Sequence, residues 1–332
     1  MRAAVFTGQP GEIALARIPD PDPGPQDVLI AVKRCGVCGT DLAMTSGEGW
    51  LLPEGSQFGH EYAGEVVAVG SEVKTHRVGD LVTAVPSGFC GSCHHCDTEN
   101  VVLCKESDSA AFGFAELAVL PAKQALILPT EVGLSAGALV EPLAISHYGV
   151  RLSGLCAGQD VVILGAGAVA LYTIYWARQF GARRIVVVSR SERRRALCLK
   201  LGADEFVVSD ENAADRVRAA LAGKPKVIFE CAGATGMLGL AMQFAGAFSK
   251  IVSLGFCMAP DPITPAVAAY QCISFQFLVG YTLADFHASI NALERDLELE
   301  LTISSTISLD ELPQMMRALR GVHAETKVHV AF

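Results

Sequence analysis

Residues Val161–Ala170 read VVILGAGAVA, and this stretch decides the fold of the 332-residue chain. Its apolar start predicts a buried strand, and the G-x-G-x-x-A pattern that follows predicts a tight turn into a helix. Gly165 permits the turn, Gly167 lets the backbone approach a pyrophosphate, and the small Ala170 allows the helix to pack on the strand. A purely structural turn is the alternative, but the flanking strand and helix favour a dinucleotide site, with the phosphates at the helix N-terminus.

Short apolar runs alternate with helix-compatible segments from residue 160 onward. The pattern predicts strands at residues 161–164, 185–188, 227–229 and 251–254. It predicts helices at residues 168–180, 192–201, 213–222 and 235–245. This alternation is typical of a parallel sheet covered by crossover helices. We therefore expect an α/β fold with a doubly wound, Rossmann-type parallel sheet.

The first 145 or so residues have a different texture. Val28–Val32 and Gly64–Val69 are strand-like, and glycine, proline and aspartate mark the loops between such runs. From Asp285 the chain returns to mixed helix and strand. We expect a second, β-rich domain, and we find no internal repeat.

The end of the second predicted strand of the parallel sheet indicates which dinucleotide fits. An acidic residue there would bind the ribose 2′-hydroxyl and select NAD. This chain instead has Ser189 followed by Arg190, with Arg194 farther along. A hydroxyl and guanidinium groups suit a 2′-phosphate, so we expect NADP(H) to be preferred over NAD(H). A solvated basic helix face is the alternative.

Four cysteines follow the pattern C-x2-C-x2-C-x7-C. They are Cys90, Cys93, Cys96 and Cys104. Four thiolates at this spacing can close a tetrahedron around zinc, which is typical of a structural site. Two local disulfides are the alternative. They conflict with the odd total of 11 cysteines and with an N-terminus that lacks a signal-peptide layout, so we expect reduced thiols and a cytoplasmic protein.

A second group of candidate metal ligands is Cys38, His60 and Glu61. One thiolate, one imidazole and one carboxylate suit a zinc site that keeps an open position. Such a zinc would polarise a carbonyl or stabilise an alkoxide. A packed Gly-His-Glu turn is the alternative.

The composition excludes several classes of protein. Lys plus Arg is 26 against 35 for Asp plus Glu, a net charge of −9, so the chain lacks the overall basic character of a nucleic-acid-binding protein. Charged residues are 18% and hydrophobic residues 51%, which excludes wholesale disorder. Residues 161–177 and 262–284 carry no charge, but the first is short and the second contains prolines and glutamines. We expect a small-molecule substrate, with no nucleic acid and no membrane as partner.

The motifs together resemble the zinc-dependent medium-chain dehydrogenase/reductase family, and most of all its sorbitol and threonine dehydrogenase branch. The resemblance rests on residues 59–64 (GHEYAG) with Gly70, Val73 and 79–80, the cysteine group, residues 141–144 (EPLA) and the glycine turn. These occur in the family's order and cover essentially the whole chain. The resemblance implies a GroES-like catalytic domain with a structural zinc lobe at residues 1–146 and 286–332. It implies a Rossmann domain at residues 147–285.

The resemblance also assigns roles to matching positions. Cys38 and His60 would be catalytic zinc ligands, and Glu61 and Glu141 are both candidates for the third. Asp41 would orient His60. Thr40 would pass the substrate proton outward. A helix-start carboxylate is the alternative for Glu141, and a local backbone hydrogen bond is the alternative for Thr40.

One position departs from the family's pattern. Relatives commonly carry a histidine three residues beyond the relay hydroxyl, where this chain has Ala43. We therefore expect proton release through the cofactor ribose and water, or by another route. The departure affects the relay and leaves the hydride transfer in place.

The substrate pocket is predicted from apolar residues near the two sites. They are Met44, Trp50, Leu51 and Phe256, and Gly255 completes the expected cofactor-binding set. If these side chains line one cavity, a bulky apolar alcohol, ketone or aldehyde fits; core or interface packing is the alternative. The leading hypothesis is a zinc-dependent, NADP(H)-dependent alcohol dehydrogenase or carbonyl reductase. A polyol or amino-acid dehydrogenase is the second, and a non-catalytic NADPH-binding redox sensor the third.

Relatives pair the last strands of their Rossmann domains into dimers, and often tetramers. The run Cys272–Gly280 is apolar enough for such an edge, although a buried core would explain the same composition. The resemblance thus implies a homodimer or homotetramer.

Overall fold

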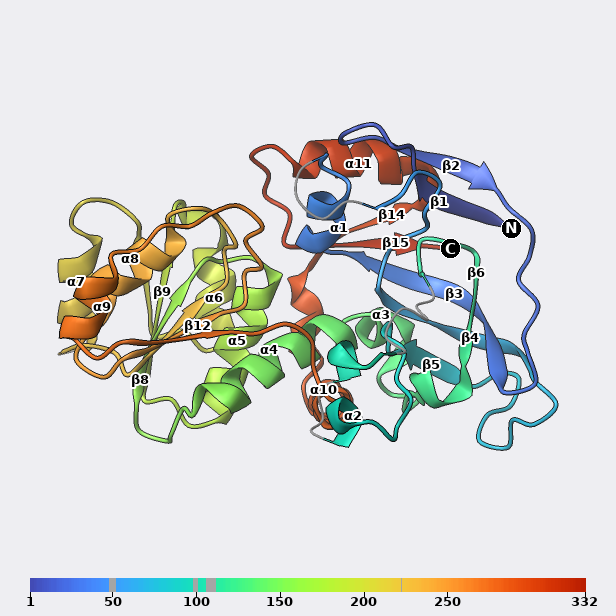
Figure 1. Ribbon diagram of the computed structural model, residues 1–332, viewed down its shortest axis with the longest axis horizontal. Coiled ribbons are helices and arrows are strands. Elements are labelled where there is room, and N and C mark those ends of the chain that lie inside the picture. The colour runs from blue at the N-terminus through green and yellow to red at the C-terminus, as the bar shows by residue number, and fades with distance from the viewer. Residues whose placement is uncertain (48–51, 98–100, 106–111, 222) are drawn as a thin grey trace. The chain divides into compact units, whose positions relative to one another are not determined.

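A computed structural model describes residues 1–47, 52–97, 101–105, 112–221 and 223–332. The chain forms two compact units (Figure 1). Unit 1 comprises Met1–Ala144 and Tyr281–Phe332, and unit 2 comprises Ile145–Gly280. Each unit has its own sheet and core.

Unit 2 contains six parallel strands among the described residues, in the order β10-β9-β8-β11-β12-β13. The strands are β8 (Asp160–Leu164), β9 (Arg184–Ser189), β10 (Glu205–Val208), β11 (Val227–Glu230), β12 (Lys250–Ser253) and β13 (Ser274–Phe277). In chain order this is 3-2-1-4-5-6, the order of a dinucleotide-binding sheet built from two halves that meet between its first and fourth strands. The predicted doubly wound parallel sheet is confirmed.

The helices of unit 2 cover both faces of that sheet (Figure 1). They are α4 (Val140–Ser153, which begins in unit 1), α5 (Ala168–Gln179), η3 (Glu192–Arg194), α6 (Arg195–Lys200), α7 (Ala213–Leu221), α8 (Met237–Phe244) and α9 (Pro265–Tyr270). Alternate strand residues such as Val162, Val186 and Ile228 pack in one apolar cluster with α7, α8 and α9. The predicted segment at 192–201 begins as a 3-10 turn and continues as α6.

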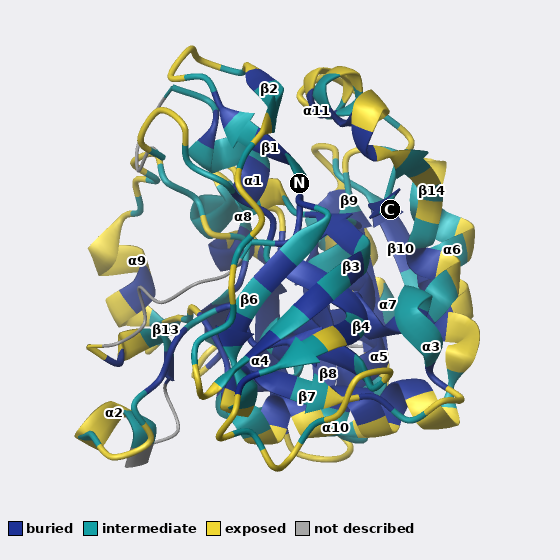
Figure 2. Ribbon diagram, turned by 90° about the vertical axis from the view of Figure 1, so that its right-hand side faces the viewer, coloured by how far each residue is buried: buried dark blue, intermediate teal, exposed yellow. Residues whose placement is uncertain are grey.

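Unit 1 is built around the long strand β3 (Asp27–Val37). Its main sheet has the order β14-β15-β3-β4-β5-β7, and β6 also pairs with β3. The other strands are β1 (Arg2–Phe6), β2 (Ile13–Arg17), β4 (Glu61–Val69), β5 (Leu81–Ala84), β6 (Leu117–Pro121), β7 (Ala125–Ile127), β14 (Ile303–Ser308) and β15 (Lys327–Ala331). Val28–Val32 was predicted to be strand-like, and in this part of β3 buried and half-buried residues alternate (Figure 2).

Short helices complete unit 1. They are α1 (Gly39–Met44), α2 (His94–Asp97), η1 (Val101–Leu103), η2 (Ala122–Gln124), α3 (Gly133–Gly137), α10 (Leu283–Arg295), η4 (Leu297–Thr302), η5 (Leu309–Glu311) and α11 (Leu312–Leu319). In the part of the chain that the structure describes, no helix has the length and apolar character needed to cross a membrane.

Candidate functional site

Cys38 caps the first turn of α1, and this fixes the position of its sulfur. The Sγ atom accepts a hydrogen bond from the Thr40 backbone N–H (3.5 Å), and the Asp41 carboxylate accepts one from the Cys38 N–H (2.9 Å). This reciprocal pair is a capping box, with cysteine in the place where serine or threonine usually stands. The sequence C-G-T-D thus holds a thiol at a defined point beside a buried carboxylate.

His60 lies beside the same carboxylate. It follows Gly59, which has φ +91° and packs against the Phe114 ring so closely that a Cβ would lie 2.5 Å from it. The imidazole Nδ1 is 3.3 Å from Asp41 Oδ1, so Nε2 is the ring nitrogen that would bind a metal ion. Burial lowers the pKa of His60, but Asp41 and Cys38 outweigh it, and the net pKa is raised well above its usual value. The surroundings of the ring therefore favour positive charge.

Glu61, the first residue of β4, reaches across Gly36 on the neighbouring strand. A Cβ at Gly36 would lie 2.2 Å from Glu61 Oε2, so only glycine leaves room for the carboxylate. Lys327 of β15 meets it there, with Nζ 2.7 and 2.6 Å from the two carboxylate oxygens. Lys327 was not among the predicted site residues, because a lysine at a strand end gives no signal for a partner 266 positions away.

Cys38, His60 and Glu61 converge on one point. Their donor atoms all lie within 4.8 Å of one another, a spacing that a metal ion could bridge. Glu141 in the first turn of α4 is outside this group of three, but its carboxyl is buried close enough for charge to act on it. Burial raises the pKa of Glu141 to about 7, with Glu61 adding to the rise and His60 opposing it. The donor set fits zinc in chemistry and spacing.

The remaining predicted residues of this region lie around α1. Thr40 Oγ1 is 3.6 Å from Cys38 Sγ, next to the candidate metal position. Met44 is half-buried at the end of α1. Trp50 and Leu51 lie outside the described residues.

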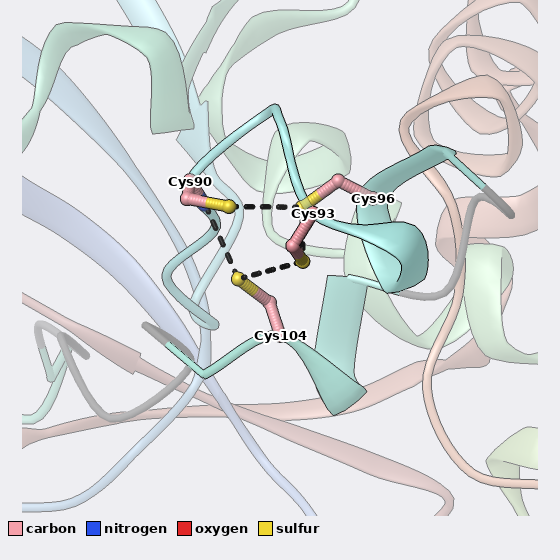
Figure 3. A group of neighbouring side chains, drawn as sticks. All are labelled: Cys90, Cys93, Cys96 and Cys104. Carbon is pink, nitrogen blue, oxygen red and sulfur yellow. Dashed lines mark hydrogen bonds between the residues drawn. The ribbon is translucent and has the colours of Figure 1, made fainter.

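The four clustered cysteines bring their sulfur atoms together (Figure 3). The Sγ–Sγ distances are 3.9 Å for Cys90–Cys96, 3.7 Å for Cys93–Cys96 and 3.8 Å for Cys93–Cys104. Four sulfurs at about 2.3 Å from one zinc ion would lie roughly 3.8 Å apart, so the spacing fits a tetrahedral site. Hydrogen bonds from Ser92 lower the pKa of Cys90 to about 6, which favours the thiolate that zinc requires.

The predicted dinucleotide turn lies at the carboxyl end of β8 in unit 2. Gly165 has φ +108°, and Ala170 of α5 is fully buried against the sheet. Gly167 is the N-cap of α5, and a Cβ built on it would meet nothing within 4 Å, so open space lies over this helix end. Backbone N–H groups beside such space form a phosphate cradle.

The basic segment after β9 lies against this turn. Ser189 is the last residue of β9, and Arg190 is exposed beside it. Arg194 Nη1 lies 3.4 Å from the carbonyl oxygen of Ala166, inside the glycine turn. A guanidinium is thereby placed next to the predicted phosphate position.

Gly255 and Phe256 follow β12, at the other half of the same sheet edge. Phe256 is 41% exposed, adopts φ +51° and lines a cavity of about 450 Å³ together with Glu230, Leu238 and Val279. Gly255 packs directly on Gly233.

Comparisons with known proteins agree with this architecture. Residues 24–130 match the family described as alcohol dehydrogenase GroES-like domain, and residues 168–295 match zinc-binding dehydrogenase. The chain is 33% identical to a sorbitol dehydrogenase of Arabidopsis thaliana, over 75% of this chain and 72% of that protein. The chain belongs to the zinc-dependent medium-chain dehydrogenase family. Within it, the sequence falls in the sorbitol and threonine dehydrogenase-like branch.

Two further relatives match this dehydrogenase over nearly its full length. It is 28% identical to an L-threonine 3-dehydrogenase of Sinorhizobium fredii, over 97% of this chain and 96% of the relative. A solved structure from Sinorhizobium meliloti 1021, described as a zinc-binding dehydrogenase bound to NADP, matches with a TM-score of 0.87 and 30% identity. That match covers 100% of this chain and 99% of the other. The protein is therefore an oxidoreductase that acts on CH–OH donors and uses a nicotinamide cofactor.

Proposed function

We propose that this dehydrogenase is a zinc-dependent, NADP(H)-dependent alcohol dehydrogenase or carbonyl reductase. The convergence of Cys38, His60 and Glu61 carries the proposal, because it gives three different metal donors in one half-buried group. When bound, zinc supplies a Lewis acid that polarises the substrate oxygen, and NADP(H) supplies or accepts the hydride. The four-cysteine group would hold a second, structural zinc.

In this proposal, Asp41 orients the zinc ligands and Thr40 transfers a proton to or from the substrate oxygen. Asp41 fixes the imidazole of His60 through Nδ1 and, through the capping box, the backbone of Cys38. Thr40 Oγ1 is the hydroxyl that we assign to proton transfer at the substrate oxygen, since it lies 3.6 Å from Cys38 Sγ. Ala43 stands in place of a relay histidine and has no group that could accept this proton, so the proton would leave Thr40 through the cofactor ribose and water or by another route. Glu61 and Glu141 are the two candidates for the third ligand.

The preference for NADP(H) rests on unit 2. Ser189 ends β9 where NAD-selective sites carry an acid, and Arg194 lies against the glycine turn. The relative from Sinorhizobium meliloti is described as bound to NADP, which supports the same choice. Gly165, Gly167, Ala170 and Gly255 complete the proposed cofactor site, with Arg190 as a second guanidinium.

Two substrate classes have support. Within unit 1, half-buried Met44 at the end of α1 favours a bulky apolar ketone or aldehyde, and within unit 2 so does Phe256, which lines a cavity. The names of the relatives, a sorbitol and a threonine dehydrogenase, favour a polyol or an amino acid. Chelator-sensitive oxidation of NADPH and NADH against ketones, aldehydes and ketoses, with the reverse assay on polyols and threonine, separates the two. Bulky-ketone turnover lost on removal of zinc supports the first class, and turnover confined to small hydrophilic substrates supports the second.

A zinc-loaded protein that binds NADPH but turns over no substrate in either panel would contradict the proposal. That result would instead favour the cofactor-binding sensor. A protein that keeps its activity after both zinc ions are removed would contradict the metal-dependent mechanism.

We further infer a homo-oligomer formed through the edge strand β13. Phe277 is 65% exposed at the end of this strand, and α9 beside it carries much exposed surface (Figure 2). An uncovered apolar edge strand is a surface that a second copy could pair with. Light scattering of the wild type and of Phe277→Lys tests this inference, since the variant would shift toward monomer. We also propose a reducing compartment such as the cytoplasm, because none of the eleven cysteines, all of which lie among the described residues, forms a disulfide.

A further inference from the structure

Glu230 is a buried carboxylate that the proposed reaction does not use. It ends β11, is 2% exposed and makes three hydrogen bonds within unit 2. Its Oε1 accepts from the backbone N–H groups of Ala232 (2.7 Å) and Gly233 (2.8 Å), and its Oε2 accepts from Ser253 Oγ (3.1 Å). The side chain therefore joins the loop that follows β11 to the end of β12.

The two loops that Glu230 joins cross at unusually close range. A Cβ at Gly233 would lie 1.8 Å from the carbonyl oxygen of Gly255, and a Cβ at Gly255 would lie 2.1 Å from the Gly233 nitrogen. Gly233 also has φ +63°, a conformation that favours glycine. Neither position has room for a side chain while the carboxylate holds the loops together.

The same loop also passes close to Gly165 of the glycine turn. A Cβ at Gly165 would lie 3.3 Å from the Ala232 nitrogen, so residues 231–232 lie directly beneath the turn. In a sheet of this strand order, the adenosine half of a dinucleotide lies over the first three strands. The nicotinamide half then lies over β11, β12 and β13, where Gly233 and Gly255 cross.

We propose that Glu230 is a positioning residue that clamps the Gly233–Gly255 crossing and thereby shapes the platform for the nicotinamide half of the cofactor. The inference rests on the proposed NADP(H) dependence. Its physical basis is that two backbone N–H groups and one hydroxyl donate to one buried carboxylate, so removal of the carboxylate leaves three part-buried donors without this acceptor and frees the crossing to open. The adenosine and its 2′-phosphate would be held by Ser189, Arg190 and Arg194, none of which takes part in the hydrogen bonds of Glu230.

The test compares two ligands on the zinc-loaded full chain. NADPH binding is followed by its fluorescence, and adenosine 2′,5′-bisphosphate, which lacks the nicotinamide and its ribose, by calorimetry. Glu230→Leu should weaken NADPH binding about tenfold or more while the bisphosphate affinity stays within about twofold. Glu230→Gln is the matched control, because an amide accepts both backbone N–H groups through its oxygen and donates to Ser253. It should stay within about threefold of wild type for both ligands.

Gly255→Ala provides a second route if Glu230→Leu does not fold. Its methyl group would force the crossing apart and should reproduce the selective loss of NADPH affinity. Equal weakening of both ligands, or unchanged NADPH binding in the leucine and alanine variants, would overturn the inference. Failure of the wild type to bind either ligand would overturn the proposed cofactor itself, a result distinct from failure of the clamp.

Discussion

Lys327 and Glu61 form a buried ion pair in which Nζ contacts both carboxylate oxygens, at 2.7 and 2.6 Å. The side chains are 3% and 1% exposed, and Lys327 Nζ also lies 3.3 Å from the carbonyl oxygen of Val37. A candidate metal ligand is thus tied to the last strand of the chain. This tie ensures that the charge of Glu61 is balanced whether or not a metal takes one of its oxygens.

Removing the lysine should destabilise the protein strongly. Lys327→Met leaves the Glu61 carboxylate buried without its partner, and the free energy of unfolding should fall by about 3–5 kcal/mol. The double variant Lys327→Met/Glu61→Leu should lose less free energy of unfolding than the two single variants together. Urea denaturation of the metal-free single and double variants measures these free energies. Arg218→Met, which breaks an exposed ion pair with Asp215, is the control. If the free energy of unfolding falls no more in Lys327→Met than in this control, the buried ion pair does not stabilise the protein.

Loss of one clustered cysteine should remove one zinc ion per chain. Cys104→Ser deletes one of four sulfurs spaced for a tetrahedral site, so the metal content should fall from two to one and the unfolding temperature should drop. Elemental analysis of the purified protein gives the stoichiometry. Cys156→Ser makes the same chemical change at an exposed position and should retain both ions. Equal metal content in the two variants would contradict the assignment of a second zinc.

Arg194 should contribute to cofactor choice. Arg194→Ala removes a guanidinium beside the glycine turn and should raise the KM for NADPH about 10- to 100-fold, because a charge-assisted contact to the 2′-phosphate is lost. The KM for NADH should change little. Steady-state kinetics with both cofactors measures the ratio, and exposed Arg193→Ala is the neighbouring control. A parallel rise for NADH would indicate that Arg194 only supports the turn.

His329 should make the protein sensitive to acid. This β15 residue is fully buried, and neither ring nitrogen has a hydrogen-bond partner among the described residues. Burial lowers its pKa to about 3, with Lys327 and Arg34 adding to the shift. Below the unfolded pKa of about 6.5, only the unfolded chain takes up this proton, so stability falls as the pH drops from there toward 3.

His329→Leu removes both the unpaired polar ring and this proton. The variant should be more stable than wild type at pH 8, and its advantage should grow by about 1 kcal/mol by pH 5.5. Urea denaturation at the two pH values measures the difference, and His287→Gln on the exposed face of α10 is the control. An advantage that is constant with pH would show that His329 is protonated in the folded protein as well.

The sequence predicted the parallel sheet because short apolar runs alternate with helix-compatible segments from residue 160 onward. Val161–Leu164 and Ile185–Val188 appear as β8 and β9. The strand β10 was missed because its four residues, Glu205–Val208, form a short run that only pairing with β9 makes a strand. In the site, the cysteine spacing predicted which sulfurs converge, since those contacts are local. The partners of Glu61 and Glu230 could not be predicted, because each contact depends on how separate strands align.

The capping box at α1 has one more consequence. The sulfur of Cys38, a candidate metal donor, also caps the start of this helix, and serine caps helices at least as well as cysteine does. A change of Cys38 to Ser would therefore erase a metal donor while the local backbone kept its shape. If Cys38 is a zinc ligand as proposed, a single substitution at this position would remove metal binding and activity while the fold remained intact.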